Sequence, residues 1–162
     1  PRCSSNGGSH MITYREASAL DIPVLTSMEK TLFPESPWST AQFKEEFAGV
    51  PRTRYFCVAI DGENIIGYAG VMVIAPGVEA DILTVGVFAT YRKQGIGRAF
   101  MDQIEAWSIH REAPAMMLEV DVENIAAVAL YESLGYSKIS TRKDYYGPSL
   151  DAFVMRKELV IP

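Results

Sequence analysis

The feature that most constrains the fold is a glycine-containing turn, residues 92–98, that joins an expected strand to an expected helix. The strand covers residues 81–88, and the helix begins at Ile96 and places apolar side chains at helical spacing. Two glycines separated by one residue allow the backbone of the turn to pass close to a ligand. The first N–H groups of the helix and its positive end suit a phosphate or a pyrophosphate. The turn therefore predicts an anion site at a strand-to-helix junction.

By itself this turn is ambiguous. It lacks the Gly-x-x-x-x-Gly-Lys-Ser/Thr sequence of a Walker phosphate loop. Phe100 stands where a dinucleotide-binding fingerprint has its third glycine. A tight turn between a strand and a helix, with no ligand, is the alternative, so the surrounding segments must decide between the two interpretations.

The rest of the chain indicates one domain of mixed structure. Residues 1–10 are polar and glycine-rich and end Gly-Ser-His before Met11, which is typical of a cloning or protease-site remnant. We expect a single domain over residues 11–162, because neither an internal repeat nor a linker is visible. Hairpins and crossover helices together predict an α+β fold, a mixed sheet in a sandwich of three layers.

The expected elements alternate in the order β, α, α, β, β, β, α, β, α, β, β. The expected strands are residues 12–15, 53–60, 65–75, 81–88, 116–120, 136–142 and 152–159, and the expected helices are residues 18–32, 39–48, 96–107 and 124–134. The first helix is expected to be capped by Ser18 and to carry an apolar face of Leu20, Val24, Leu25, Met28 and Leu32.

Composition excludes several classes of protein and partner. Hydrophobic residues make up 48% of the 162 residues and charged residues 22%, which is typical of a globular protein. No run approaches the roughly 20 apolar residues of a membrane span. A net charge of −5 argues against a nucleic-acid or anionic-membrane surface, and two cysteines with two histidines argue against a zinc site. We expect a cytoplasmic protein with no metal and no nucleic-acid or membrane partner.

Two segments after the glycine turn carry candidate chemistry. Glu119 lies in an apolar expected strand, so its carboxylate either faces solvent or lies in a half-buried cleft, where it suits a general base. In the helix 124–134, Asn124, Val128 and Tyr131 share one face, and the alanines between them leave room for a slender ligand. An N-cap asparagine followed by a core tyrosine is the alternative.

Two aromatic pairs are candidates for contact with a substrate. Phe33 and Trp38 flank a proline-containing loop between two expected helices, where they either pack on the core or form the lip of a substrate site. Tyr145 and Tyr146 precede a Gly-Pro turn, where paired tyrosines are commonly structural but also suit peptide recognition. Both pairs are consistent with packing alone or with a peptide site.

Taken in order, these segments resemble the GNAT acetyltransferase superfamily and, within it, the RimI-type ribosomal-protein alanine N-acetyltransferases. The superfamily signature Arg/Gln-x-x-Gly-x-Gly/Ala matches residues 92–97, and the resemblance covers the chain from Met11 onward. It implies a GNAT-like mixed, mostly antiparallel twisted sheet flanked by helices on both faces. The matching stretches outside the turn are Phe33-Pro34, Pro37-Trp38-Ser39, Val85-Gly86-Val87, Leu118-Glu119-Val120, Asn124, residues 129–136 and Tyr145-Tyr146.

The resemblance also implies roles for individual residues. Glu119 corresponds to the family's proton acceptor, and Tyr131, twelve residues later, corresponds to its proton donor. One departure is the acidic stretch 121–123, where relatives more often carry an arginine and small residues. The expected substrate contacts are Phe33, Trp38, Tyr145 and Tyr146. The expected acetyl-CoA contacts are Val85, Gly86, Val87, Arg92, Lys93, Gln94, Gly95, Ile96, Gly97, Arg98 and Asn124.

The reaction that the resemblance implies is direct transfer of an acetyl group from acetyl-CoA, without a metal, to the N-terminal alanine of ribosomal protein S18. The expected partner is therefore the N-terminal peptide of a ribosomal protein. Other N-termini, a lysine or a small amine are alternative acceptors, and an acetyl-CoA-binding module without turnover is the non-enzymatic alternative. We expect Tyr131 to keep an ordinary pKa near 10. We expect Gly86 to mark a bulge that turns its N–H toward the thioester carbonyl.

Overall fold

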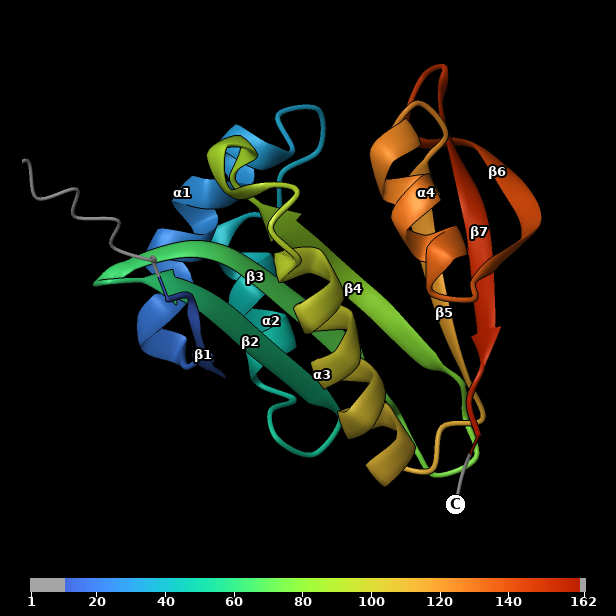
Figure 1. Cartoon of the computed structure of the whole chain (residues 1–162), viewed down its shortest axis with the longest axis horizontal. Coiled ribbons are helices and arrows are strands. Elements are labelled where there is room, and N and C mark those ends of the chain that lie inside the picture. The colour runs from blue at the N-terminus through green and yellow to red at the C-terminus, as the bar shows by residue number, and fades with distance from the viewer. Residues whose placement is uncertain (1–10, 161–162) are drawn as a thin grey trace, which may run out of the picture.

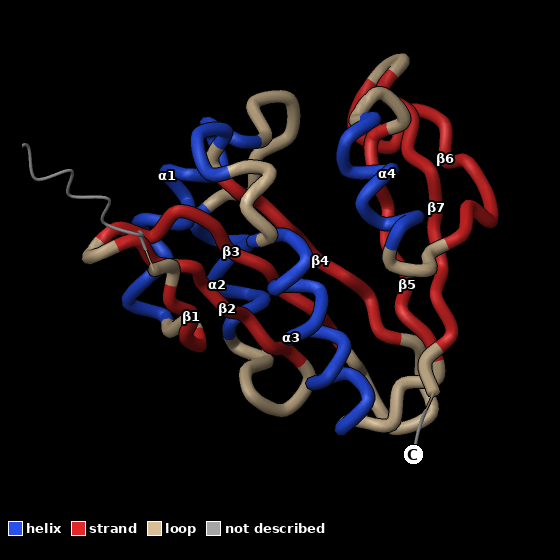
Figure 2. Tube along the Cα trace, in the orientation of Figure 1, coloured by secondary structure: helices blue, strands red, loops and turns tan. Residues whose placement is uncertain are grey.

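The computed structural model describes residues 11–160, so the expected remnant at residues 1–10 lies outside the described part. Within this part, seven strands form one sheet in the order β1-β2-β3-β4-β5-β7-β6 (Figures 1 and 2). The strands are β1 (Thr13–Glu16), β2 (Arg54–Asp61), β3 (Asn64–Met72), β4 (Ala80–Val87), β5 (Ala115–Asp121), β6 (Ser137–Gly147) and β7 (Leu150–Glu158). The helices are α1 (Ile22–Leu32), α2 (Thr40–Phe47), α3 (Ile96–His110) and α4 (Ile125–Ser133), with short 3-10 turns η1 (Ala19–Asp21) and η2 (Ala89–Tyr91). The expected order and the mixed α and β fold are confirmed.

Helices cover both faces of the sheet, because successive strand residues point to opposite sides. Cys57 of β2 belongs to a buried cluster that includes Phe100 of α3. The next residue, Val58, belongs to a second buried cluster with Leu25 of α1 and Phe43 of α2. The sheet therefore lies between α3 on one side and α1 with α2 on the other, as the resemblance implied.

β4 and β5 form the parallel pair of the described sheet, and they pair over a short length. Only two register pairs join them, Ala80 with Met116 and Asp81 with Met117. Beyond these pairs the two strands diverge (Figure 1). The edge of β4 that faces β5 is therefore unpaired with a neighbouring strand over residues 82–87. This divergence divides the sheet into a β1-β2-β3-β4 part and a β5-β7-β6 part.

The expected apolar face of the first helix is wrong at its beginning. Residues 19–21 form the 3-10 turn η1, and α1 starts only at Ile22. A 3-10 turn has about 3.0 residues per turn and an α-helix about 3.6, so the pattern before Ile22 is out of phase with α1. Leu20 and Val24 are 90% and 46% exposed. The buried residues of α1 are Ile22, Leu25, Met28 and Glu29.

Candidate functional site

The glycine turn between η2 and α3 has a backbone that fits an anion. Gly95 forms the N-cap of α3 with φ +81, and a Cβ atom at this position would meet nothing within 4 Å. The left-handed conformation, not crowding, therefore requires glycine at position 95. At Gly97, by contrast, a Cβ atom would lie 3.1 Å from Leu130 of α4. The first N–H groups of α3 thus lie beside α4 under an open turn, which suits a pyrophosphate.

The side chains of the turn differ in what they offer a ligand. Ile96 is buried in the core, so only its backbone is available. Arg98 donates a hydrogen bond to Ser133 Oγ of α4 at 3.2 Å, and Arg92 Nε donates to the backbone oxygen of Val87 at 3.3 Å. These bonds connect the turn to the end of β4 and to α4. The exposed residues of the turn are Arg92, Lys93, Gln94, Gly95 and Arg98.

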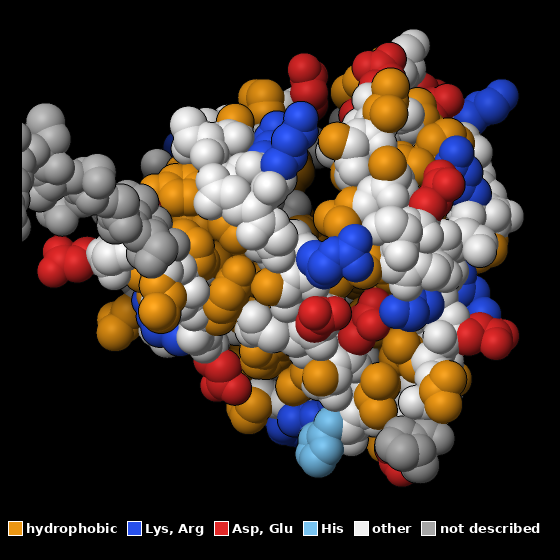
Figure 3. All heavy atoms as spheres, viewed as in Figure 1, with side chains coloured by type: hydrophobic (Ala, Val, Ile, Leu, Met, Phe, Trp, Pro, Cys, Tyr) orange, Lys and Arg blue, Asp and Glu red, His pale blue; other side chains and the backbone are white. Residues whose placement is uncertain are grey.

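The surface is hollowed between the two parts of the sheet. Figure 3 shows this hollow between the side of the molecule that carries α3 and the side that carries α4, with Lys and Arg side chains at its rim. The hollow follows the divergence of β4 and β5. Basic side chains at its rim are suited to a ligand that carries phosphate groups.

Gly86 lies in the unpaired half of β4, where a larger side chain would require the end of the Leu32 side chain to move. A Cβ atom there would lie 2.8 Å from Leu32 Cδ1 at the end of α1. The irregularity in the β3–β4 pairing lies elsewhere, because the register passes from Thr84 to Ile82 and skips Leu83. The expected bulge at Gly86 is therefore wrong.

The direction of the β4 amide groups also differs from the expectation. The N–H of Phe88 donates to the backbone oxygen of Ile66 on β3 at 3.0 Å. Because N–H groups alternate in direction along an antiparallel strand, the N–H of Gly86 also faces β3. The N–H groups of Val85 and Val87 face the open edge instead. They, and not the N–H of Gly86, are the backbone donors available to a ligand between β4 and β5.

β5 places Glu119 at the boundary between the core and the open edge. Its neighbours Leu118 and Val120 are buried, and the Glu119 side chain is 25% exposed. Glu119 Oε1 accepts a hydrogen bond from Arg142 of β6 at 3.3 Å. The guanidinium of Arg142 lies 4.8 Å from the ring centre of Tyr145. Glu119 is therefore a half-buried carboxylate with a cationic neighbour and not part of a fully solvated face.

Tyr131 lies on the buried side of α4 and is 8% exposed, with its ring 5.9 Å from that of Tyr136. Burial raises the pKa of Tyr131 to about 12, so the expected ordinary value is wrong. Burial also raises the pKa of Tyr146, to which Tyr145, Glu119 and Tyr131 contribute as neighbours. Tyr146 is thus close enough to both Glu119 and Tyr131 for each to contribute to the raised pKa of its hydroxyl.

Asn124 begins α4 in the manner of an N-cap. Its Oδ1 accepts a hydrogen bond from the Ala127 N–H at 3.2 Å, which satisfies one of the free donors of the helix. The N-cap interpretation of Asn124 is therefore confirmed. Its expected contact with acetyl-CoA stays a prediction.

The expected substrate contacts come from two segments at the same end of the molecule, on either side of the diverging strands (Figure 1). Phe33 and Trp38 are partly buried against the second cluster, and the Trp38 ring lies 5.1 Å from Phe43. Tyr145 and Tyr146 lie in β6 next to its hairpin with β7, with ring centres 4.8 Å apart. These four residues are thus partly or largely exposed to solvent, and their expected contact with a substrate stays a prediction.

Sequence reasoning did not assign site roles to Arg142 or Asp81. Arg142 pairs with Glu119 although 23 residues separate them. Asp81 lies where β4 and β5 still pair, and burial, followed by the charges of Glu119 and Glu79, raises its pKa. No local pattern indicates that either residue lies near Glu119, because that proximity depends on the order of strands in the sheet.

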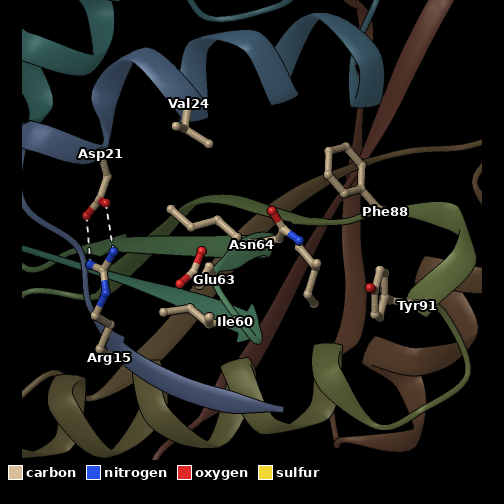
Figure 4. A pocket seen from close by; sticks show the side chains of 10 residues that line it. Arg15, Asp21, Val24, Ile60, Glu63, Asn64, Phe88 and Tyr91 are labelled. Atoms are coloured by element: carbon tan, nitrogen blue, oxygen red, sulfur yellow. Dashed lines mark hydrogen bonds and ion pairs between the residues drawn. The ribbon is translucent and has the colours of Figure 1, made fainter. Parts of the chain in front are cut away.

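A pocket of about 570 Å³ lies apart from these residues, between α1 and the turn that joins β2 to β3 (Figure 4). Polar groups in it or at its edge already pair: Arg15 with Asp21 at 2.8 Å, and Tyr91 with Asp61 at 2.5 Å. None of the residues expected to bind substrate or acetyl-CoA lines this pocket. Among the described residues, no group of potential metal ligands gathers, and none of the helices is long and apolar enough to span a membrane.

Comparison with known proteins agrees with this geometry. Residues 23–136 match the Acetyltransferase (GNAT) family. N-alpha-acetyltransferase RimI of Mycobacterium tuberculosis is 32% identical over 151 residues, covering 91% of this chain and 92% of that protein. The ribosomal protein bS18-alanine N-acetyltransferase of Escherichia coli K12 is 31% identical over 143 residues, covering 87% of this chain and 90% of that protein.

Solved structures share the fold along most of the chain. The crystal structure of the ribosomal-protein-S18-alanine N-acetyltransferase from Escherichia coli matches with a TM-score of 0.81 at 26% identity, covering 94% of this chain and 96% of that chain. Arabidopsis thaliana NAA60 in complex with acetyl-CoA has the same fold, with a TM-score of 0.80 at 21% identity, covering 92% of this chain and 99% of that chain. The chain therefore belongs to the GNAT acetyltransferase family and is an acetyl-CoA-dependent N-acetyltransferase.

Proposed function

We propose that the chain acetylates the α-amine of the N-terminal alanine of ribosomal protein S18, in the cytoplasm and within a single domain over residues 11–162. The observation that carries the proposal is the half-buried Glu119 on β5, the strand that diverges from the unpaired edge of β4, paired with Arg142 of β6, whose guanidinium also contacts the Tyr145 ring. Relatives named for acetylation of this alanine, 31% identical over 87% of this chain, support the choice of acceptor.

A protein N-terminus suits this site because its amine is easy to deprotonate. The amine must be neutral to attack a thioester, and its ordinary pKa is about 7.7–8.0, against about 10.4 for lysine. The difference of roughly 2.5 units makes lysine costlier to deprotonate by about 3.4 kcal/mol. A single carboxylate such as Glu119 is an adequate proton acceptor for an N-terminus.

Acetyl-CoA supplies the activated acetyl group. In the proposal, the open turn and the first N–H groups of α3 hold its pyrophosphate, with Arg92 to Arg98 around it. Asn124 contacts it from α4, and the segment Val85-Gly86-Val87 lines its path. The N–H groups of Val85 and Val87 face the open edge and are positioned to stabilise negative charge on the thioester oxygen.

Tyr131 is proposed to act at the sulfur. The amine nitrogen forms a bond to the acetyl carbon, the carbon–sulfur bond breaks, and one amine proton passes to Glu119. The departing thiolate has an ordinary pKa of about 8.5, which is below that of the phenol. Because burial raises the pKa of Tyr131 to about 12, its phenol stays protonated at neutral pH. It donates a hydrogen bond to the sulfur and makes the thiolate a better leaving group.

Mass spectrometry of acceptor peptides tests the choice of acceptor. The S18 N-terminal peptide should gain one acetyl group at its α-amine, whereas the same peptide with a blocked α-amine should gain none at lysine. Raising the pH from 7 to 9 should accelerate the reaction only modestly, because the α-amine is largely neutral at the higher pH. Acetylation of lysine alone, with a steep gain at pH 9, would reassign the acceptor, and binding of acetyl-CoA without transfer to any amine would remove the enzymatic proposal.

The Glu119→Gln variant tests the proton acceptor. It should lose at least about a hundredfold in kcat/KM, because it removes general base catalysis while keeping the shape of the side chain. The affinity for acetyl-CoA should not change. Glu158→Gln, at an exposed carboxylate of β7, should retain wild-type kinetics and serves as the matched control. A Glu119→Gln variant as active as the wild type would exclude the assigned role.

A further inference from the structure

The loop 33–38 between α1 and α2 is bonded at its far end to the side chain of Glu29 of α1. The backbone oxygen of Glu29 accepts a hydrogen bond from the Phe33 N–H at 2.8 Å. Its carboxylate Oε1 accepts another from the Trp38 N–H at 3.2 Å. Residues 34–37, between these two points, are exposed. The Phe33 N–H thus makes the last main-chain bond of α1, whereas the Trp38 N–H is held by the side chain of Glu29.

Glu29 is also joined to the sheet. Its side chain is almost completely buried, with 2% of the residue exposed, and Oε2 accepts a hydrogen bond from the hydroxyl of Tyr68. Tyr68 is fully buried in β3 and lies opposite Gly86 of β4 in the register. Two hydrogen bonds therefore connect the loop, through the Glu29 carboxylate, to Tyr68 of β3.

Burial of a carboxylate is costly, so an apolar side chain would serve packing better if packing were its only function. Glu29 has two donors for its two oxygens. One of them, the Trp38 N–H, belongs to a loop residue that no regular helix or strand pairing satisfies. The carboxylate thus secures a specific loop position that an apolar residue cannot secure.

We propose that Glu29 is a positioning residue that fixes the acceptor-side loop and thereby sets the affinity for the acceptor but not for acetyl-CoA. The inference rests on the proposed function, in which Phe33 and Trp38 contact the acceptor peptide. The proposed acetyl-CoA contacts lie on α3, on α4 and along β4, and Glu29 has no hydrogen bond to any of them.

The double variant Glu29→Leu/Tyr68→Phe separates positioning from stability. It replaces both partners of the buried hydrogen bond by apolar groups, which limits the loss of stability. It leaves the Trp38 N–H without its acceptor and leaves the backbone bond from Phe33 intact. Glu29→Gln is the conservative variant, because its amide oxygen can still accept from the Trp38 N–H. Ser108→Ala is the matched control, since it removes a buried hydrogen bond within α3, far from the loop.

Steady-state kinetics and hydrogen exchange are measured on each full-length variant. In the double variant we expect the KM of the S18 N-terminal peptide to rise about tenfold, the equivalent of one lost hydrogen bond to a charged group. We expect the KM of acetyl-CoA to stay unchanged. The amide of Trp38 should exchange faster while that of Phe33 stays protected. The single variant Glu29→Gln should have the wild-type KM for the peptide, and Ser108→Ala should leave both KM values unchanged.

Two results would overturn the proposal. One is a folded double variant with a wild-type peptide KM, and the other is an equal rise of the peptide KM in Ser108→Ala. If the wild type acetylates no N-terminal peptide, the proposed function is wrong, but the positioning role of Glu29 can still be tested. Exchange at Trp38 then decides the positioning role alone: faster exchange in the double variant supports it, and unchanged exchange overturns it.

Discussion

Three carboxylic acids of this protein, Glu119, Glu29 and Asp81, have different surroundings. Glu119 is half-buried beside Arg142. Glu29 is buried and accepts two hydrogen bonds, and burial raises its pKa. The pKa of Asp81 is raised by burial and by the nearby charge of Glu119. At the scale of single residues, these three acids therefore differ in how deeply they are buried and in which charged or polar groups lie beside them.

The raised pKa of Tyr131, about 12, predicts the shape of the pH profile. With an N-terminal peptide as acceptor, kcat should not fall between about pH 8 and about pH 10, because the phenol keeps its proton through this range. Tyr131→Phe should lower kcat at least about tenfold throughout. Tyr136→Phe, which removes the hydroxyl of the adjacent buried ring, should leave kcat unchanged. A wild-type profile that falls with an apparent pKa near 10 would contradict this assignment.

The raised pKa of Glu29 predicts that its contribution to the free energy of unfolding decreases as the pH rises. Its pKa is raised above its ordinary value of 4.5, so the folded protein holds this proton more tightly than the unfolded chain. Its contribution to the free energy of unfolding is fully present below about pH 4.5 and is lost as the pH rises through the folded-state pKa. Urea titrations should show the stability of the wild type relative to Glu29→Gln decreasing over this range. A difference that is constant or increases with pH would refute the prediction.

At the scale of secondary-structure elements, the shape of the segment that joins β4 to α3 is set by its main chain. Different reasons favour glycine at its two glycine positions. Gly95 has a left-handed conformation, and Gly97 lies close to the Leu130 side chain. Both causes act on the segment that presents the N–H groups of α3. The side chains around them contribute charge, but the shape of the proposed pyrophosphate site comes from the main chain.

This difference allows a matched test of the turn. Gly95→Ala should cost about 1–2 kcal/mol of stability through its positive φ and should raise the KM of acetyl-CoA several-fold. Gly62→Ala, in the β2–β3 turn, has φ +62 and equally open surroundings, so its stability cost should be similar. The KM of acetyl-CoA should be unchanged in Gly62→Ala. Equal effects of both variants on this KM would show that strain alone, not the position of the turn, is responsible.

At the scale of the whole molecule, the site exists because two parts of one sheet separate. β4 and β5 pair at only two positions before they diverge. α3 belongs to the first part, and its N-terminal turn is held to α4 of the second part by the bond from Arg98 to Ser133. The proposed proton acceptor and donor lie on the second part, whereas the open amide edge lies on the first. In the proposed mechanism, catalysis therefore depends on how the two parts are fixed relative to each other.

The proposed limits of the domain give a prediction at the same scale. Removal of residues 1–10 should leave kcat, both KM values and the midpoint of thermal unfolding unchanged, because we assign the activity to residues 11–162. Kinetics of the shortened and the complete chain, measured in parallel, test this. A change in the peptide KM on removal would assign these residues a part in acceptor binding.

The order and type of the elements, the strand-to-helix position of the glycine turn and the N-cap at Asn124 follow from the amino-acid sequence alone. These features depend on contacts between residues a few positions apart, which periodicity and capping patterns report directly. The 3-10 turn before Ile22 broke this periodicity, so the exposure of Leu20 did not follow from the pattern.

Only the tertiary structure decided which distant groups meet. The sheet order β4-β5-β7-β6 brings Arg142 to Glu119, and the packing of α1 on β3 brings Glu29 to Tyr68, 39 residues away in the chain. The pairing of β4 with β3 turns the N–H of Gly86 toward β3 and the N–H groups of Val85 and Val87 toward the open edge. Local patterns carry no signal for such pairs, because burial, partner and amide direction are fixed only when the strands assemble.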